Sequence, residues 1–410
     1  MSVTLSANFP GLNTTGGRLD RATEKNKIVS LCNKTDISYF QMLDPQTLEP
    51  IGLAQQKSLH SSLKGPSSAT HAKSDPTTGD VYNYNLEYGR KGIYRVFKVS
   101  ASTGQTSILA TISADSSYLH SLFLTENYVI LCVWNAFFSL AGTSIFYHMN
   151  IVDSIAKYDN TRPATWYVVD RTPVEGGGKG LVATYESSHF FAFHTINAYE
   201  ESDSQTGQTD IIADIIAYDN HDCIKRYYLD NMMSDSPTAK GLRDGAFDHC
   251  RATIRRFRLA KIPSKHSTQQ LKAELVFSRA RDIYIELPAI NPTRLMRKYR
   301  YVYAMMDTGK SAFFDGLIKY DVETHENIQW SYHGQTAGEP VFVADPDSDE
   351  EDGGVLLSVV LDGIEGKSYL LVLDAKTMKE VGRASVNGVV GFGFHGTHVP
   401  SGGDGVALQL

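Results

Sequence analysis

The sequence predicts an all-β fold in which short hairpins follow one another along the chain. Apolar runs of strand length alternate with turns rich in Gly, Asn, Asp and Pro, and these turns recur at short intervals. In addition, five segments share one pattern, in which two apolar strands are joined by an acidic or small residue and a short Thr-containing linker: 43–52, 96–109, 158–170, 318–330 and 372–384. Repeated hairpins of this kind are what the sheets of a β-propeller contribute, although these repeats are too degenerate to count the sheets.

The stretch HSLFLTENYVIL, which begins at His120, is the central element of this pattern. It predicts a strand, a turn at 125–127 and a second strand of almost unbroken apolar residues. His120 alternates with Leu122 and Leu124, which places all three side chains on the inward face of the first strand. A single histidine in such a position is usually a hydrogen-bonded core residue.

Three further histidines stand in similar surroundings, far apart in sequence. They are His71 in SSATHAKSDP, His194 in HFFAFHTINAYEE and His395 in VVGFGFHGTH. Each lies at a predicted strand end or turn, among aromatic or small residues. Four imidazoles without a carboxylate suit iron(II), and they leave positions open for oxygen or water. Zinc would fit four imidazoles too, so the residue types alone do not select the metal.

Residues 133–156 depart from the strand pattern. Their apolar residues are dense, with Ala, Ser and Gly between them, and the length suits one or two amphipathic helices. We expect this segment to form a small helical cap on the propeller. The alternative is a helix whose outer face enters a membrane surface to collect an apolar substrate.

Composition excludes several classes of protein. The net charge of −7 provides no basic surface for nucleic acid. The four cysteines have no paired short spacing, so neither a zinc ribbon nor a disulfide framework is indicated, and a reduced, cytoplasmic setting follows. The N-terminal residues lack the pattern of a signal peptide, and no apolar run is long enough to span a bilayer. We therefore expect a cytoplasmic protein, with peripheral membrane contact as the alternative.

All four histidine stretches, in this order, resemble segments of the carotenoid cleavage oxygenases, which are non-haem iron enzymes. That family carries an A-H-P-K-x-D-P segment, an H-S-F-x-x-T-x-N-Y segment, an F-H-x-x-N-x-Y-E segment and a terminal F-H-G segment. The corresponding residues here are 70–76, 120–128, 193–200 and 394–396. Because the four segments cover nearly the whole chain, the sequence is identified as a member of this family.

The resemblance implies a seven-bladed β-propeller with Fe(2+) on its central axis. The four ligands would be His71, His120, His194 and His395, each from a different blade. His398 is the nearest rival for the fourth position, but the Phe-His-Gly pattern favours His395. No organic cofactor is implied.

In the family, glutamates accept hydrogen bonds from three of the four histidines, which aims the imidazoles and keeps them neutral. Glu286 in IELPAIN matches the F-E-x-P-x-I-N segment, and Glu339 in GEPVFV matches the S-E-P-x-F-V segment. Asp36 in KTDIS stands where the third glutamate is usual. Because aspartate is one methylene shorter, either a close approach of the backbone or a bridging water is expected there.

The implied activity is oxidative cleavage of a conjugated carbon–carbon double bond in a carotenoid or apocarotenoid, with O2, to two aldehydes. The residues of these segments look most like those of fungal members of the family. A stilbene-cleaving dioxygenase is the alternative, and isomerisation and hydrolysis of a polyene ester would use the same site. No protein partner is implied. The predicted tunnel-lining residues, for which core packing is the alternative, are Phe137, Phe138, Phe146, Tyr147 and Phe392.

The start of the chain departs from the family, whose members have on the order of a hundred further residues before the segment that begins here, roughly one to two propeller blades. We therefore expect residues 1–410 to form a single propeller domain that is incomplete on its N-terminal side. A truncated, non-catalytic propeller fragment is the rival interpretation, because unpaired sheet edges are a liability.

Overall fold

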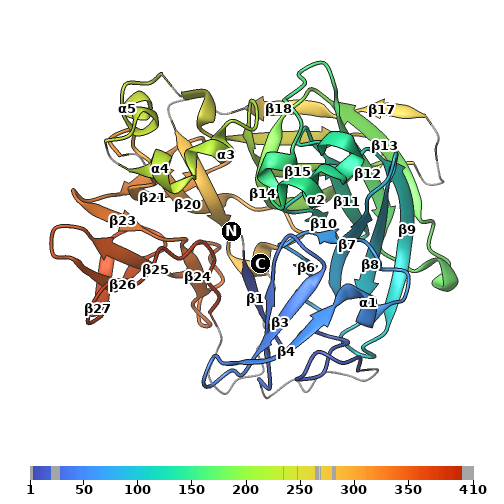
Figure 1. The fold of residues 1–410 in the computed structure, drawn as a ribbon, viewed down its shortest axis with the longest axis horizontal. Coiled ribbons are helices and arrows are strands. Elements are labelled where there is room, and N and C mark those ends of the chain that lie inside the picture. Colours follow the sequence, from blue (N-terminus) through green and yellow to red (C-terminus); the bar gives the residue numbers. More distant parts are fainter. Residues whose placement is uncertain are drawn as a thin grey trace.

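The computed structural model describes residues 3–19, 28–233, 235–246, 248–263, 267, 269–278, 283–311 and 313–398. Within these residues the strands form six sheets that follow one another around a common axis (Figure 1). Neighbouring strands are antiparallel in every described pair except β13 with β17. The predicted all-β propeller is therefore confirmed.

The first three sheets take up the chain in order. The first contains β1 (Thr4–Ala7), β2 (Leu31–Lys34), β3 (Tyr39–Leu43) and β4 (Pro50–Gln55). The second contains β5 (Ser67–Ser68), β6 (Lys73–Ser74), β7 (Val81–Glu87), β8 (Gly92–Val99) and β9 (Thr106–Ala114). The third contains β10 (Phe123–Leu124), β11 (Tyr128–Val133), β12 (Ala164–Asp170), β13 (Leu181–Ser187) and β17 (Gln270–Lys272), a strand that returns from further along the chain.

The remaining three sheets continue around the ring. The fourth contains β14 (Phe191–Ser202), β15 (Thr209–Tyr218), β16 (Thr253–Leu259) and β18 (Glu274–Ser278). The fifth contains β19 (Tyr284–Ala289), β20 (Tyr301–Asp307), β21 (Gly316–Asp321) and β22 (Asn327–Trp330). The sixth contains β23 (Gln335–Ala337), β24 (Val341–Ala344), β25 (Gly354–Asp362), β26 (Lys367–Asp374) and β27 (Glu380–Ser385).

Sheet packing explains why the inner strands are apolar on both faces. In β11 five of the six residues are buried, because neighbouring sheets cover both sides of the strand. Trp166 of β12 shows how two sheets interlock, since its ring centroid lies 4.9 Å from that of Phe257 in the next sheet. The resulting core is continuous through most of the ring.

The predicted strand around His120 is shorter than expected. Strand β10 contains only Phe123 and Leu124, and His120 lies in the irregular segment before it. Leu122 and Leu124 are buried, but so are the residues between them, so burial does not alternate there. Sheets on both sides of this segment cover both of its faces.

Residues 133–156 contain a short helical cap rather than long amphipathic helices. The elements there are η1 (Ser139–Gly142), α2 (Ser144–His148) and η2 (Val152–Ser154). Two residues explain the short lengths, because Leu140 has a φ of 49° and Met149 a φ of 50°, and helical residues do not adopt positive φ. The described part contains seven helices away from this cap: α1 (Gln56–Leu59), η3 (Val174–Gly176), α3 (Cys223–Arg226), α4 (Leu229–Met232), α5 (Pro237–Arg243), η4 (Asp248–Cys250) and η5 (Pro292–Arg294).

The predicted count of seven blades differs from the six sheets that the described residues form. Every described strand is already used in these six, so no strands remain there for another sheet. The sixth sheet buries Leu356, Val360 and Leu371 on one face. Its other face carries partly exposed Leu357 and Val372, which lie opposite each other in β25 and β26.

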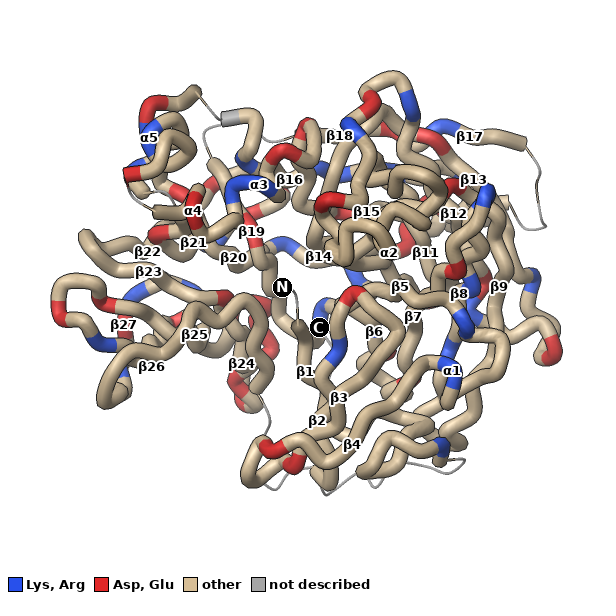
Figure 2. The backbone as a smooth tube through the Cα atoms, in the orientation of Figure 1, with Lys and Arg blue, Asp and Glu red and all other residues tan. Residues whose placement is uncertain are grey.

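Charged residues of both signs are intermixed around the periphery in Figure 2, which agrees with the absence of a basic surface from the sequence analysis. The four cysteines are buried and free, as their spacing indicated. Within the described residues, no helix has the length and apolar character that crossing a bilayer requires.

Candidate metal centre

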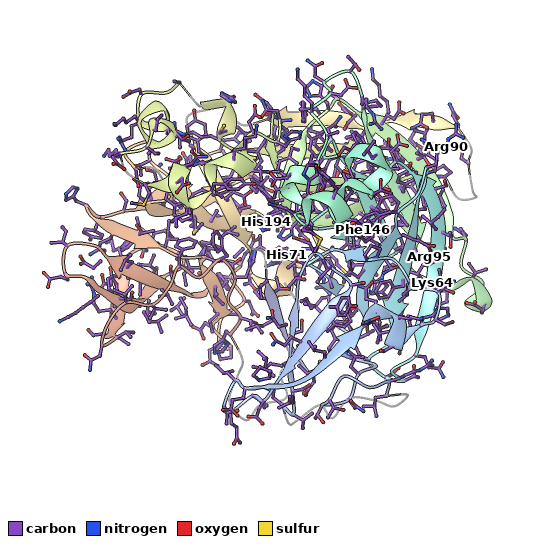
Figure 3. The ribbon with its side chains drawn as sticks, viewed as in Figure 1. Lys64, His71, Arg90, Arg95, Phe146 and His194 are labelled. Carbon is purple, nitrogen blue, oxygen red and sulfur yellow. The ribbon has the colours of Figure 1, made fainter. Side chains whose placement is uncertain are left out.

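Four inner segments bring the predicted imidazoles to one point on the propeller axis. His71 lies between β5 and β6, His120 precedes β10, His194 is part of β14 and His395 follows β27. The first two segments are joined directly, because the His71 backbone N–H donates to the His120 carbonyl over 3.2 Å. Figure 3 shows the side chains of His71 and His194 close together at the centre of the ring.

The geometry of the four imidazoles is that of a metal site. One nitrogen of each ring lies within 4.8 Å of the others, and Nε2 of His71 lies 3.2 Å from Nε2 of His395. A metal–imidazole bond is about 2.1 Å, so two nitrogens on one ion are separated by roughly 3 to 4 Å. Nε2 of His120 and Nε2 of His194 are buried without a hydrogen-bond partner, which an ion at this point would supply. The donor set therefore fits a metal that accepts imidazole.

Three carboxylates hold the outer nitrogens of three imidazoles. His120 Nδ1 donates to Asp36 over 2.6 Å, His194 Nδ1 donates to Glu286 over 2.5 Å, and His395 Nδ1 donates to Glu339 over 3.0 Å. These bonds fix the tautomer, so that Nε2 of each ring is the free nitrogen that faces the others. The structure thus places all seven predicted residues in one cluster.

Asp36 contacts His120 directly, without the bridging water that was one of the two expectations. Its carboxylate also accepts the Thr70 hydroxyl over 2.7 Å and the Tyr118 hydroxyl over 2.9 Å. Burial opposes the charge on Asp36, but His120 and these two hydroxyls hold its pKa below the usual value. The N–H of Ser68 donates to the Asp36 carbonyl, which draws the backbone toward the site and makes up for the shorter side chain.

Glu286 is 2% exposed and has a complete set of donors. In addition to His194, it accepts the N–H of Leu287 over 2.7 Å and the Tyr218 hydroxyl over 3.0 Å. Burial works against its charge, yet these donors hold the pKa of Glu286 below its usual value. Sequence reasoning missed Tyr218, because nothing near this tyrosine in the chain indicates that it reaches residue 286.

The environment favours neutral imidazoles, as metal ligation requires. Burial lowers the pKa of His71 well below its ordinary value, and the neighbouring imidazoles lower it further. Burial also lowers the pKa of His194, although the charge of Glu286 opposes that shift. Both rings therefore present a lone pair at neutral pH.

A row of partly exposed aromatic rings lies beside the imidazoles. The rings of Tyr118 and Phe193 lie 6.2 and 6.1 Å from that of His120, measured between centroids. Each ring of this aromatic row contacts the next: Tyr118, Phe193, Tyr227, Phe313, Phe392 and Phe394. Of the aromatics predicted to line a tunnel, only Phe392 belongs to this row. An aromatic residue stands one or two positions before His120 and His194, and this local pattern could have identified Tyr118 and Phe193.

The other four predicted tunnel residues lie elsewhere. Phe146 and Tyr147 are 72% and 85% exposed, so the prediction that they line a tunnel is wrong. Both side chains belong to short helix α2 of the cap. Phe138 is buried against Tyr88, and Phe137 stacks on the Arg162 guanidinium. These two rings are core residues, which was the alternative interpretation. The rival ligand His398 is exposed and is not part of the imidazole cluster.

Comparisons with known proteins agree with this fold. A sequence profile of the family described as "Retinal pigment epithelial membrane protein" matches residues 26–400. The chain is 40% identical over 421 residues to a Fusarium fujikuroi protein named torulene dioxygenase, and the match covers 98% of this chain and 72% of the relative. It is 41% identical over 432 residues to a Neurospora crassa protein named carotenoid dioxygenase, with 98% and 69% covered.

A solved structure extends the likeness to the fold. A variant of the Synechocystis apocarotenoid oxygenase superimposes with a TM-score of 0.69 at 20% identity, over 89% of this chain and 71% of that one. This likeness shows the fold, and the profile match over residues 26–400 together with the identity to the fungal relatives places the chain in a defined family. The chain belongs to the carotenoid cleavage oxygenase family, whose profile carries the name of the retinal pigment epithelial membrane protein.

Proposed function

We propose that the protein is an iron(II)-dependent dioxygenase that cleaves a conjugated carbon–carbon double bond of a carotenoid or apocarotenoid. One observation carries the proposal: four imidazoles converge on one point beside a row of partly exposed aromatic rings. The two fungal relatives named torulene dioxygenase and carotenoid dioxygenase support this substrate class. The balanced reaction adds both atoms of O2 to R–CH=CH–R′ and gives R–CHO and R′–CHO.

Each part of the site has a defined task in this reaction. His71, His120, His194 and His395 would hold the metal, and bound iron(II) would supply the redox chemistry that activates O2. The three carboxylates keep the imidazoles aimed and fix the tautomer in which Nε2 is free. The aromatic row gives a polyene a flat apolar surface next to the metal position, and this contact decides which double bond is presented there.

Product analysis tests the proposal. Purified, iron-loaded protein is incubated with β-carotene, an apocarotenal and resveratrol under ¹⁸O2, and the products are identified by mass spectrometry. Two aldehydes from a carotenoid substrate, each with one labelled oxygen before exchange with water, are expected. The His194→Ala variant should give none, whereas His398→Ala should retain the activity. Cleavage of resveratrol alone would instead identify a stilbene-cleaving enzyme, and an iron-loaded protein inert toward all three substrates would contradict the proposal.

We further propose that copies of this chain associate through the partly exposed face of the sixth sheet. The apolar character of that face supports the proposal, because four partly exposed side chains lie on it: Leu357, Val359, Leu370 and Val372. An uncovered face of this kind promotes association. If it is uncovered in the 410-residue chain, the protein should self-associate in gel filtration, and Leu357→Gln with Leu370→Gln should reduce this. A change at exposed Leu48 is the control, and a wild-type monomer would argue against an uncovered face.

The protein is also proposed to contact a membrane surface through its helical cap. Phe146, Tyr147 and Met149 near α2 are 72 to 85% exposed, and Leu229 of α4 is 71% exposed. The Tyr228 hydroxyl donates to Asp153 over 3.3 Å, so these two helical segments lie side by side. A cluster of exposed apolar side chains on short helices is suited to the interfacial region of a bilayer.

Vesicle sedimentation tests this contact. Wild-type protein should sediment with phosphatidylcholine vesicles, and Phe146→Ser with Tyr147→Ser should reduce the bound fraction several-fold. Leu48→Ser removes an apolar side chain that is 60% exposed in the first sheet and should have no effect. Equal binding by all three proteins would refute a role for the cap.

A further inference from the structure

A cavity lies against the imidazole cluster, and its lining contains no residue of the helical cap. The cavity contacts His71, His194 and His395. A second cavity adjoins it, since Lys73 and Thr195 line both. None of the aromatic row lines either cavity. The space is therefore separate from the proposed polyene surface.

The direction of the inner segments explains this separation. Tyr118 and Phe193 precede His120 and His194 in the chain and belong to the aromatic row. Ser121 and Thr195 follow the same histidines and line the cavity instead. Along these two segments, an aromatic side chain comes first, the metal-facing imidazole follows, and a side chain that lines the cavity comes last.

Lys73 is the exceptional residue of the cavity wall. It follows His71 by two residues in β6, and its ammonium group has no hydrogen bond or ion pair within the described part of the chain. Lys34, which is 1% exposed, lies close enough for the two positive charges to interact unfavourably. A lysine in a recessed position without a counter-charge is costly, which makes an anion a favourable partner.

Most other polar groups of the wall are already in use. The Ser121 and Thr195 hydroxyls bond to each other over 2.7 Å, and Thr195 also donates to the Leu122 carbonyl. The Thr4 hydroxyl donates to the Thr70 carbonyl, and Glu339 accepts from His395 and from the Gly396 N–H. Within the described residues, Lys73 is therefore the charged donor of the wall that has no partner, and the Thr397 hydroxyl, which also lines the cavity, is a neutral one. Much of the remaining wall is apolar: Leu5, Ile196, Ile290, Leu295, Pro340 and Val341.

We propose that this cavity binds a monocarboxylate, with its carboxylate on Lys73 and its apolar chain against the Ile196 and Leu295 wall. The ammonium group of Lys73 matches a single negative charge, and an apolar wall matches a hydrocarbon chain. The ligand could be a fatty acid or an acid derived from a carotenoid, which share this chemistry. The proposal concerns binding and stands independently of the proposed oxygenase activity.

Calorimetric titration of the metal-loaded protein with acetate, butyrate and hexanoate tests the site. Affinity should rise by about fourfold per added methylene, the value expected for burial of a CH2 group. Hexanamide, which has the same chain without the charge, should bind at least tenfold more weakly than hexanoate. The Lys73→Met variant should weaken hexanoate binding by roughly 10- to 100-fold, because a charge-assisted hydrogen bond is lost.

Two control variants separate the charge of Lys73 from general damage. Lys73→Arg keeps the charge and should retain binding, and Lys64→Met removes an exposed lysine at the periphery (Figure 3) and should change nothing. Metal content and thermal unfolding of each variant establish that the site is intact. With cobalt(II) as the metal, hexanoate should leave the visible spectrum unchanged. Undiminished binding to Lys73→Met, or a spectral change that reveals a carboxylate on the metal, would overturn the proposal.

Retinoic acid and palmitate, titrated under the same conditions, distinguish the two sources of the carboxylate. Binding of either one that depends on Lys73 supports the site and identifies the class of acid. If hexanoate binds and neither long acid does, the cavity does not admit the chain lengths of these two sources, and the assignment to them is wrong.

Discussion

Replacing Glu286 by Gln should weaken metal binding while leaving the fold intact. The change removes a charge at constant shape, at a residue that is 2% exposed and accepts from His194, Leu287 and Tyr218. His194 and Leu287 both donate to Oε2, so an amide oxygen at that position can still accept both bonds. The amide nitrogen would then face the Tyr218 hydroxyl, which can rotate to accept.

The magnitude follows from the loss of charge assistance. A hydrogen bond to a charged group contributes about 1.5–3 kcal/mol, against about 0.5–1.5 kcal/mol for a neutral one. For the His194 and Leu287 bonds together, the loss is about 2 kcal/mol, or a factor of roughly 30. Because His194 is then held less firmly, metal affinity should decrease by about 10- to 100-fold, the range seen when a hydrogen-bond partner of a metal ligand is replaced.

Competition with a chelator measures this loss. Iron(II) or cobalt(II) is titrated into wild type, Glu286→Gln and Glu350→Gln, and circular dichroism verifies the fold of each. Glu350 is exposed and pairs with Lys376, so its replacement should leave metal affinity unchanged. A Glu286→Gln affinity within threefold of wild type would show that the carboxylate does not support the metal site.

Three further predictions concern other residues. His395→Ala should lower the iron content measured by plasma emission to well below one per chain, whereas His398→Ala should not; the reverse result would move the fourth ligand. Asp36→Asn should reduce metal affinity about as much as the change at the buried glutamate, because Asp36 bonds its histidine directly; an effect below threefold would indicate a bridged contact instead. Asp321, which accepts from Arg300, has a pKa lowered to about 2 by that bond and by backbone donors that outweigh its burial. Since its unfolded value is higher, it stabilises the fold above about pH 4, and this contribution is lost as the pH falls toward 2. The stability difference between wild type and Asp321→Asn, from urea unfolding, should therefore shrink between pH 5 and pH 2.5, and a constant difference would contradict this reasoning.

The sequence by itself determined the features that depend on short segments. Turn residues and strand-length apolar runs predicted the all-β propeller, which the structure confirms. The motifs around His71, His120, His194 and His395 selected the four imidazoles that the fold brings together. The same kind of local match assigned Glu286 to the carboxylates that hold the imidazoles, and the structure pairs it with His194, a residue 92 positions away.

The tertiary structure alone decided features that depend on distant segments. Tyr118 and Tyr218 reach Asp36 and Glu286 across 82 and 68 residues, and no local pattern encodes such contacts. The outward direction of Phe146 depends on positive φ values that interrupt the cap helices, which an apolar segment does not reveal. That Lys73 has no partner among the described residues likewise became visible only with its surroundings in place. Apolar periodicity specifies which side chains are buried, whereas the order of the sheets around the axis determines what each buried side chain meets.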